Sequence, residues 1–183
     1  VNVLVATSGD TGSAVANGFL GVEGIHVYVL YPKGKVSEIQ EKQFTTLGQN
    51  ITALEVDGTF DDCQALVKAA FMDKELNSRL QLTSANSINV ARFLPQAFYY
   101  FYAYAQLKRA GKAANAVICV PSGNFGNITA GLFGKRMGLP IKRFIASNNR
   151  NDIFYQYLQT GVYTPRPSVA TIANAMDVGD PSN

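Results

Sequence analysis

The stretch from Val117 to Asn127 constrains the fold most, because it joins a strand, a loop and the start of a helix within one short segment. A β-branched run ends at Pro121 and passes into a loop rich in Gly and Asn before a helical segment. In such a loop the backbone can approach a ligand closely, and N–H groups together with the helix dipole favour a phosphate or another small anion. The alternative is an ordinary turn that uses Gly for positive φ and Asn as a helix cap.

The start of the chain repeats this pattern. An apolar run from Val3 to Ala6 leads into small residues, and a helical segment follows Gly12. Thr7, Ser8 and Thr11 place three hydroxyl groups in this turn. Two turns of this kind in one chain favour ligand binding over ordinary connections.

Strand-like and helical segments alternate along the whole chain, which predicts an α/β fold of parallel sheets with helices on both faces and right-handed crossovers. We expect further strands at 25–31, 51–56, 80–84 and 142–146. We expect helices at about 13–20 and 37–47, from the turn at 57–62 to about residue 76, from residue 89 to about 109, from the second turn to about 137, and at 152–158. The best linker candidate is Gly111 to Asn115, so we expect a small α/β domain at 1–112 and part of a larger domain at 113–183.

Two expectations follow for packing. The helix before residue 109 carries so many Phe and Tyr residues that it should be buried on most sides. Ligands of open α/β sheets collect beyond the carboxyl ends of the strands. The polar segments after the first, fourth and fifth predicted strands should therefore face one cleft.

Composition excludes several classes of protein. With 183 residues, 47% hydrophobic and 16% charged, the chain can bury a core, but no stretch is apolar enough to span a bilayer and none reads as a secretory signal. We therefore expect a soluble cytoplasmic protein. A net charge of +3, spread along the chain, argues against nucleic acid, and the lack of a Cys/His cluster argues against zinc or another metal site.

The two cysteines and the single histidine are interpreted as structural residues. Cys63 falls in a predicted helix and Cys119 in a predicted buried strand, which favours two reduced, packed thiols and leaves a disulfide as the alternative. His26, the single histidine, has no thiol partner nearby in the sequence and is interpreted as structural.

Four segments together resemble a known family. They are Thr7 to Gly12 (TSGDTG), Asn86 to Arg92 (NSINVAR), Pro121 to Asn127 (PSGNFGN) and Asn174 to Asn183 (NAMDVGDPSN). In order and spacing they resemble the fold type II enzymes of pyridoxal 5'-phosphate, the tryptophan synthase β-like family. Within it they are most similar to the long bacterial and fungal threonine synthases, which implies conversion of O-phospho-L-homoserine and water to L-threonine and phosphate.

The resemblance also implies roles for residues. Gly123, Asn124, Phe125, Gly126 and Asn127 would hold the cofactor phosphate, mostly through backbone N–H groups. Thr7, Ser8, Gly9, Asp10, Thr11 and Gly12 would bind the substrate carboxylate. Many relatives carry Asn at position 10, and an ionised Asp10 only accepts hydrogen bonds, so its direct contact with a carboxylate is in question.

The third segment would complete the substrate site, through Asn86, Ser87, Asn89 and Arg92. The planar fork of Arg92 suits the phosphate of a phosphorylated amino acid, and the alternative is a salt bridge to a neighbouring helix.

The lysine that forms the Schiff base with the cofactor has no counterpart here. In the family it follows a Phe, precedes an Asp and lies upstream of the first turn. The nine lysines fall in polar turns or on charged helix faces, at positions 33, 35, 42, 68, 74, 108, 112, 135 and 142. We therefore expect an internal fragment without catalytic residues of its own, inactive alone, with little or no bound cofactor and with uncovered apolar faces that favour self-association.

Three rival functions remain. A nicotinamide-binding domain is disfavoured, because GDTG is not Gly-x-Gly-x-x-Gly and the second strand ends in YPKG rather than an acid. Another fold type II enzyme, of the cysteine synthase or threonine dehydratase type, is nearer. The third is a non-catalytic phosphate-binding α/β module.

Overall fold

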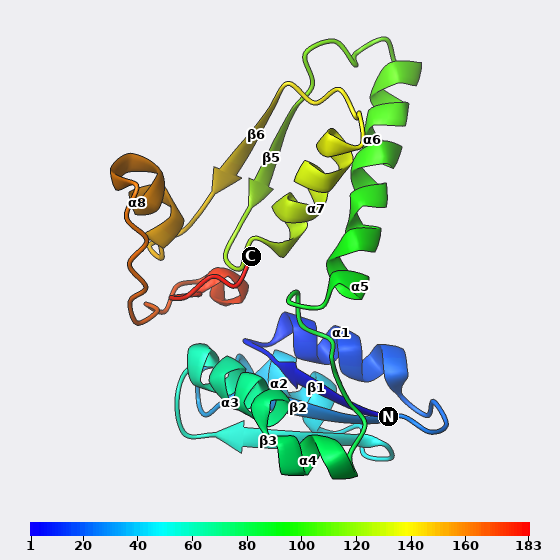
Figure 1. The fold of residues 1–183 in the computed structure, drawn as a ribbon, viewed down its shortest axis with the longest axis vertical. Coiled ribbons are helices and arrows are strands. Elements are labelled where there is room, and N and C mark those ends of the chain that lie inside the picture. The colour runs from blue at the N-terminus through cyan, green and yellow to red at the C-terminus, as the bar shows by residue number, and fades with distance from the viewer.

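The computed structural model describes residues 1–183 as two parallel sheets with flanking helices (Figure 1). The first sheet has the strand order β3-β2-β1-β4 and the second pairs β5 with β6. The strands are β1 (Asn2–Ala6), β2 (His26–Pro32), β3 (Ile51–Val56), β4 (Leu82–Ser84), β5 (Val117–Pro121) and β6 (Arg143–Ser147). The helices are α1 (Asp10–Phe19), α2 (Glu38–Thr45), α3 (Phe60–Met72), α4 (Lys74–Arg79), α5 (Val90–Phe93), α6 (Ala97–Arg109), α7 (Gly126–Arg136) and α8 (Ile153–Thr160), with short 3₁₀ turns at Leu94–Gln96 and Asn174–Met176. The expected α/β class with parallel sheets is confirmed.

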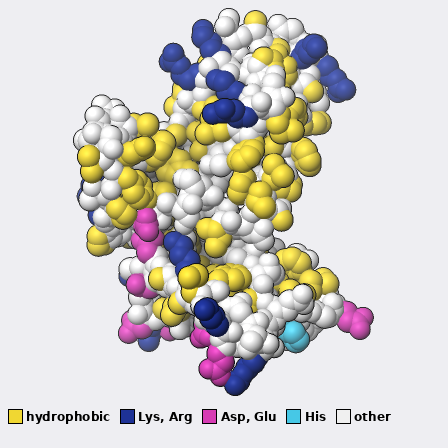
Figure 2. All heavy atoms as spheres, in the orientation of Figure 1, with side chains coloured by type: hydrophobic (Ala, Val, Ile, Leu, Met, Phe, Trp, Pro, Cys, Tyr) yellow, Lys and Arg dark blue, Asp and Glu magenta, His cyan; other side chains and the backbone are white.

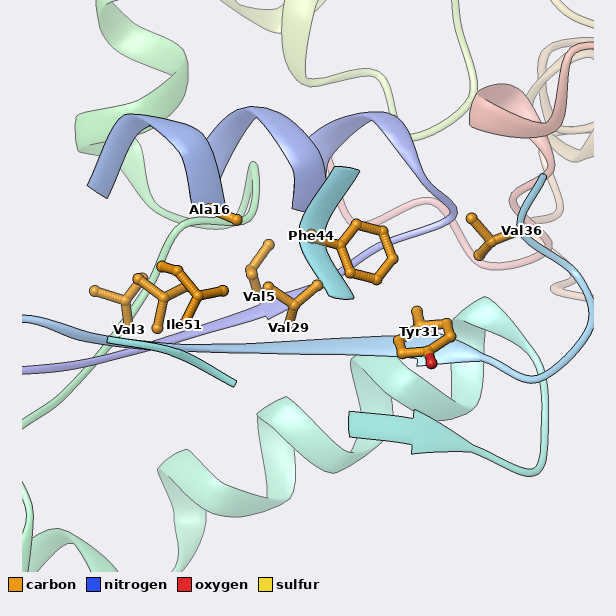
Figure 3. Packing of buried hydrophobic residues seen from close by; sticks show 9 residues of the cluster. Val3, Val5, Ala16, Val29, Tyr31, Val36, Phe44 and Ile51 are labelled. Atoms are coloured by element: carbon orange, nitrogen blue, oxygen red, sulfur yellow. The ribbon is translucent and has the colours of Figure 1, made fainter. Parts of the chain in front are cut away.

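The first sheet is buried on both faces, because helices cover both of its sides. Successive side chains of a strand point to opposite sides and therefore pack into different helical layers. Figure 3 shows one of these faces, where Val5 and Val29 pack beneath Ala16 of α1 and Phe44 of α2. Val5 is fully buried and Phe44 is 1% exposed, so each burial contributes roughly 1.5–3 kcal/mol. The side chains one residue further along each strand join α3 on the opposite face.

Helix caps in this half follow the sequence signals. Ser37 and Gln40 form a reciprocal capping box at the start of α2, and Thr59 and Asp62 form another at the start of α3. The helix expected to run to about residue 76 is divided in two. Asp73 lies in an extended conformation, ends α3 and caps α4 through its carboxylate, which accepts from the Leu76 amide over 2.9 Å.

A second half surrounds β5 and β6. Helices α6 and α7 pack on each other and on one face of this pair, around Tyr100, Val120 and Ile128. Figure 1 shows the two halves one above the other, with the C-terminal segment between them. None of the helices combines the length and apolar character that crossing a membrane requires.

The aromatic helix differs from expectation in two ways. It is interrupted by a 3₁₀ turn at Leu94–Gln96, because Pro95 lacks a backbone N–H and cannot continue an α-helix. The expectation of burial on most sides is wrong: Phe98, Tyr99 and Tyr102 are about 70% exposed. Only the face that carries Ala97 and Tyr100 packs against the second sheet. Figure 2 shows hydrophobic side chains gathered on the surface of this upper half.

The two thiols also differ. Both cysteines are free, as favoured above, and Cys63 is fully buried beneath the first sheet. Cys119 is exposed, so the expectation that it is packed is wrong. The reason is that β5 is covered by helices on one face only, and Cys119 points to the other face while its neighbour Val120 points inward.

The domain boundary expected near residue 112 stays a prediction. Helix α6 belongs by its packing to the second half, because its buried residues contact β5, α7 and their loop. This packing favours a boundary before Val90 rather than after the helix.

Candidate active site

A pocket of about 190 Å³ lies where β1, β4 and β5 end. The carboxyl ends of parallel strands are the usual place for ligands in such folds. Three of the four segments singled out in the sequence contribute polar residues to it, and the fourth contributes apolar residues. Its lining includes Ser8, Thr11, Asn86, Ser87, Arg92, Gln96, Ser122 to Asn127, Ala175, Met176 and Val178. The pocket therefore brings together all five residues expected to bind the cofactor and half of those expected to bind substrate. The expected substrate residues outside its lining are Thr7, Gly9, Asp10, Gly12 and Asn89.

The loop from Gly123 to Asn127 presents unpaired amides. The backbone N–H groups of residues 123–128 donate no hydrogen bond within the chain. Three of them, from Gly126 onward, open helix α7, where such donors have no partner inside the helix. Phe125 holds the left-handed conformation, with φ 61°, just before the helix starts. A run of free amides at a helix N-terminus suits a phosphate group.

Two glycines of this loop are required by close contacts. A Cβ at Gly126 would lie 2.7 Å from Cβ of Ser87, and one at Gly123 would lie 2.7 Å from Cα of Met176. Any side chain at either position would push the loop away from its neighbours. Phe125 anchors the loop to helix α8, because its buried ring packs on Phe154 with ring centroids 4.5 Å apart.

The first loop is held by Thr7, whose side chain is fully buried. Its Oγ1 accepts hydrogen bonds from the amides of Gly9 and Gly12 over 2.9 and 2.8 Å. The side chain of Thr7 thus shapes the loop from inside and does not line the pocket. The amides of Asp10 and Thr11, in the first turn of α1, remain without an acceptor in the chain.

Asp10 points away from the pocket. Its carboxylate accepts a hydrogen bond from Nε2 of Gln40 on helix α2. Asp10 is exposed and does not line the pocket, whereas Ser8 and Thr11 on either side do. The expected conflict between its charge and a bound carboxylate is thereby reduced in this structure.

The side chains of Asn86 and Asn89 form hydrogen bonds with backbone groups. Asn86 is buried, and its side-chain amide both accepts from the Ala6 N–H over 2.9 Å and donates to the Ala6 carbonyl over 2.7 Å. It extends the pairing of β1 with β4 by one step. Asn89 caps α5 through the Ala91 amide and donates to the Ser84 carbonyl. A contact of either side chain with a substrate stays a prediction.

Ser87 accepts two hydrogen bonds through its hydroxyl and donates none from it within the chain. It is 9% exposed, and its Oγ accepts from the side-chain amides of Asn124 and Asn183 over 2.9 and 2.8 Å. A hydroxyl has two acceptor lone pairs and one donor proton. With both lone pairs occupied, the O–H is free to donate to a ligand in the pocket.

Arg92 supplies the positive charge of the pocket. Its Nη1 donates to the Ala85 carbonyl over 2.7 Å and its Nη2 donates to Oγ1 of Thr11 over 3.2 Å. It takes part in none of the ion pairs of the chain, so the alternative of a salt bridge to a neighbouring helix is not observed. Burial lowers the pKa of its guanidinium, because the charge is partly removed from water. An uncompensated cation at this place favours an anionic ligand.

Sequence reasoning missed part of the surroundings. The hydroxyl of Tyr100 donates to Asn127, and Ser182 donates its amide to Oδ1 of Asn124 over 2.6 Å. Asn174 donates to Gln40 over 2.9 Å. Asn174 and Ser182 lie in the fourth segment singled out in the sequence, whereas Gln40 belongs to none of the four segments.

No lysine reaches the pocket. All nine are exposed, and none is among the lining residues. No group of three or more His, Cys, Asp or Glu side chains forms a metal site.

Comparison with known proteins identifies the family. The model of the family described as "Pyridoxal-phosphate dependent enzyme" matches residues 1–183. The chain belongs to this pyridoxal-phosphate-dependent enzyme family. The resemblance inferred from the four segments is therefore confirmed.

Members of the family with high similarity are threonine synthases. The chain is 57% identical over 183 residues to threonine synthase of Haemophilus influenzae, which covers 100% of this chain and 43% of that protein. The crystal structure of threonine synthase from Escherichia coli superimposes with a TM-score of 0.93 at 54% identity, over 99% of this chain and 42% of that one. A structure described as PLP-bound threonine synthase from Brucella melitensis gives a TM-score of 0.82 at 43% identity, over 100% of this chain and 39% of that one. The chain thus spans about two fifths of the length of the proteins it matches.

The residues present fit the family cofactor. Pyridoxal phosphate carries a phosphate group, and the free amides of residues 123–128 form the kind of site that binds one. The tight contacts at Gly123 and Gly126 keep that part of the backbone open to a ligand.

Proposed function

We propose that this chain forms the central part of a threonine synthase, a pyridoxal-phosphate-dependent enzyme that converts O-phospho-L-homoserine and water to L-threonine and phosphate. The single observation that carries the proposal is the pocket in which the free amides of residues 123–128 meet the unpaired charge of Arg92. Two separate anion-binding elements suit a cofactor phosphate and a phosphorylated substrate. The similarity to threonine synthases supports the choice of reaction.

Gly123, Asn124, Phe125, Gly126 and Asn127 would hold the cofactor phosphate through their amides. When bound, the cofactor supplies an electron sink that stabilises negative charge at the substrate carbon atoms. The chain's own contribution is positional. Asn124 is fixed by Ser87 and Ser182, and Asn127 by Tyr100, so the loop is rigid before a ligand arrives.

The substrate would occupy the other side of the pocket. The free amides of Asp10 and Thr11 would bind its carboxylate, and Arg92 would bind its phosphate through the planar guanidinium. Ser87 would donate its remaining proton to one of these anionic groups. Thr7, Asn86 and Asn89 would act by holding the two loops in place.

The lysine that moves protons and carries the cofactor would lie in a part of the enzyme outside residues 1–183. The nine lysines of this chain are exposed and absent from the pocket lining. The chain by itself would therefore bind the cofactor weakly or not at all and would form no threonine.

Location and partners follow as further parts of the proposal. The enzyme would act in the cytoplasm on a small phosphorylated amino acid, without nucleic acid or membrane as a partner. The isolated chain would associate with copies of itself through the exposed apolar face of α6, because contiguous apolar surface of this kind favours association. Replacing Tyr102 by Lys should then lower its sedimentation coefficient at a given concentration, and an unchanged value would contradict this part.

The test uses the longer polypeptide that contains these residues. It is supplied with O-phospho-L-homoserine, with O-acetylserine or with serine. Threonine and phosphate are measured in every reaction, and consumption of each amino acid is followed by chromatography. We expect equal amounts of threonine and phosphate from the first substrate only. Turnover of O-acetylserine or serine instead would assign the chain to a different enzyme of the same family.

A further inference from the structure

A second pocket, of about 630 Å³, adjoins the candidate active site. Ser8 lines both pockets. Gln40 of helix α2 and Asn174 of the C-terminal segment line only the larger one. Ser8 therefore lies between the two pockets, and Gln40 contacts the loop that contains it from the side of the larger pocket.

The hydrogen bonds of Gln40 fix the orientation of its amide. Its Oε1 accepts from the hydroxyl of Ser37 over 2.8 Å and from Nδ2 of Asn174 over 2.9 Å. Both of these atoms are donors, so the oxygen must face them and the NH₂ group must face the other way. On that other side it meets the carboxylate of Asp10, which is an acceptor. A rotated amide would place oxygen against carboxylate.

The fit around Gln40 is close. A Cβ at Gly9 would lie 2.6 Å from both Cδ and Oε1 of Gln40, so glycine at this position leaves the space that the amide fills. Asn174 adds a second contact to the same loop by donating to the Ser8 carbonyl over 3.3 Å. Gln40 and Asn174 together hold the outer side of the loop.

We propose that Gln40 is a positioning residue that holds the Asp10 carboxylate on the outer side of the loop, so that the amides of Asp10 and Thr11 can accept an anionic substrate group. Without this hydrogen bond the Asp10 side chain would be free to rotate toward the pocket. Its negative charge would then oppose a substrate carboxylate a few ångströms away. This inference rests on the proposed function in one respect, namely that the loop binds the carboxylate of an amino acid.

The substitution Gln40→Glu tests the contact with little disturbance elsewhere. Glu is the usual partner of Ser in a capping box, so helix α2 keeps its cap. One oxygen of the introduced carboxylate can still accept from Ser37 and Asn174, while the other now faces Asp10 and repels it. Asp10→Asn in the same molecule restores a donor opposite this carboxylate and reverses the polarity of the hydrogen bond. Gln43→Glu, at an exposed position of the same helix, is the matched control for added charge.

The four variants are compared in the longer polypeptide loaded with cofactor. In Gln40→Glu we expect the KM for the amino-acid substrate to rise about tenfold, the change that losing one charge-assisted hydrogen bond produces, while kcat changes less. In the double variant we expect the KM to return to within about threefold of that of Asp10→Asn alone. Gln43→Glu should behave as the wild type. A double variant whose KM change is the product of the two single changes would overturn the proposal.

Hydrogen exchange gives a readout that does not depend on turnover. The amides of Gly9 and Gly12, which donate to Thr7, should exchange faster in Gln40→Glu and return toward the wild-type rate in the double variant, as measured by mass spectrometry. Equal exchange in all variants would overturn the role of Gln40 even if the enzyme is active. If the wild type releases no phosphate from O-phospho-L-homoserine but the exchange pattern holds, the proposed reaction fails and the positioning role stands.

Discussion

Arg92 donates a hydrogen bond from Nη2 to Oγ1 of Thr11 over 3.2 Å, and this contact joins segments that are 81 residues apart in the sequence. Thr11 belongs to the loop after β1, and Arg92 belongs to the short helix after β4. The guanidinium is partly buried and has no acidic partner. It is held at the rim of the pocket by neutral oxygens and keeps its charge for a ligand.

Replacing Arg92 by Ala in the longer polypeptide should raise the KM for O-phospho-L-homoserine by about tenfold or more, because a charged hydrogen-bond donor to the substrate phosphate is lost. Arg92→Lys should raise the KM by a smaller factor, since an ammonium keeps the positive charge but cannot form two parallel hydrogen bonds with a phosphate. Steady-state kinetics measures both. Arg109→Ala, at the exposed end of α6, is the control. An unchanged KM in Arg92→Ala would remove Arg92 from the substrate site.

Asn86→Ala should lower the free energy of unfolding by about 2–4 kcal/mol, because the Ala6 N–H and carbonyl would both lose their buried partner. Urea denaturation of the chain measures this change. Asn2→Ala, whose side chain makes no hydrogen bond, should change stability by no more than about 0.5 kcal/mol. If the two substitutions cost the same, the side chain of Asn86 is not the support for β1 that the structure indicates.

The two cysteines should differ in reactivity. Cys119 is exposed, whereas burial raises the pKa of the Cys63 thiol to about 12 and keeps it protonated. A disulfide-forming reagent such as DTNB should label one thiol per native chain at pH 8 and two after denaturation. Rapid labelling of both thiols in the native chain would contradict the buried position of Cys63.

The same shift predicts a dependence of stability on pH. Above its ordinary pKa of 9.0 the Cys63 thiol ionises in the unfolded chain but stays protonated in the folded one. The unfolded state then binds fewer protons, so this group lowers the free energy of unfolding as the pH rises from about 9 toward about 12. Cys63→Ala should reduce that decline, as denaturation at a series of pH values would reveal.

Incubating the 183-residue chain with pyridoxal phosphate and then with borohydride should leave no stoichiometric adduct, because all nine lysines are exposed and none lines the pocket. Mass spectrometry of the intact chain measures this. The longer polypeptide, treated in the same way, should gain one cofactor. An adduct on a single lysine of the 183-residue chain would show that the chain contains its own cofactor-binding lysine.

Local pattern was enough to find most of the fold. Apolar runs bounded by Gly, Pro and Asn marked all six strands to within about two residues, and the helix expected at 37–47 begins within one residue of its expected start. These signals reside in a few adjacent residues and survive tertiary packing. The parallel arrangement of the strands and the pocket at their ends then follow from the rules of parallel sheets.

Features that depend on distant residues were not accessible in the same way. The exposure of Cys119 and Tyr102 depends on which faces of β5 and α6 are covered, and composition carries no information on that point. The capping box that joins Gln40 to Ser37 is local, but the contact of Gln40 with Asp10 joins positions 30 residues apart. The break in the aromatic helix does have a local signal, because Pro95 lacks the backbone N–H that an α-helix needs.

The segment from Asn174 to Asn183 has a consequence for how the protein is made. Its contact with Ser8 joins positions 166 residues apart, about twice the separation of the paired residues of β1 and β4. Contacts of such long sequence separation form late, because the chain must lose much entropy before they are made. On the ribosome both sheets can be complete while this segment is still inside the exit tunnel. The ligand pocket would then be the last part of these 183 residues to mature.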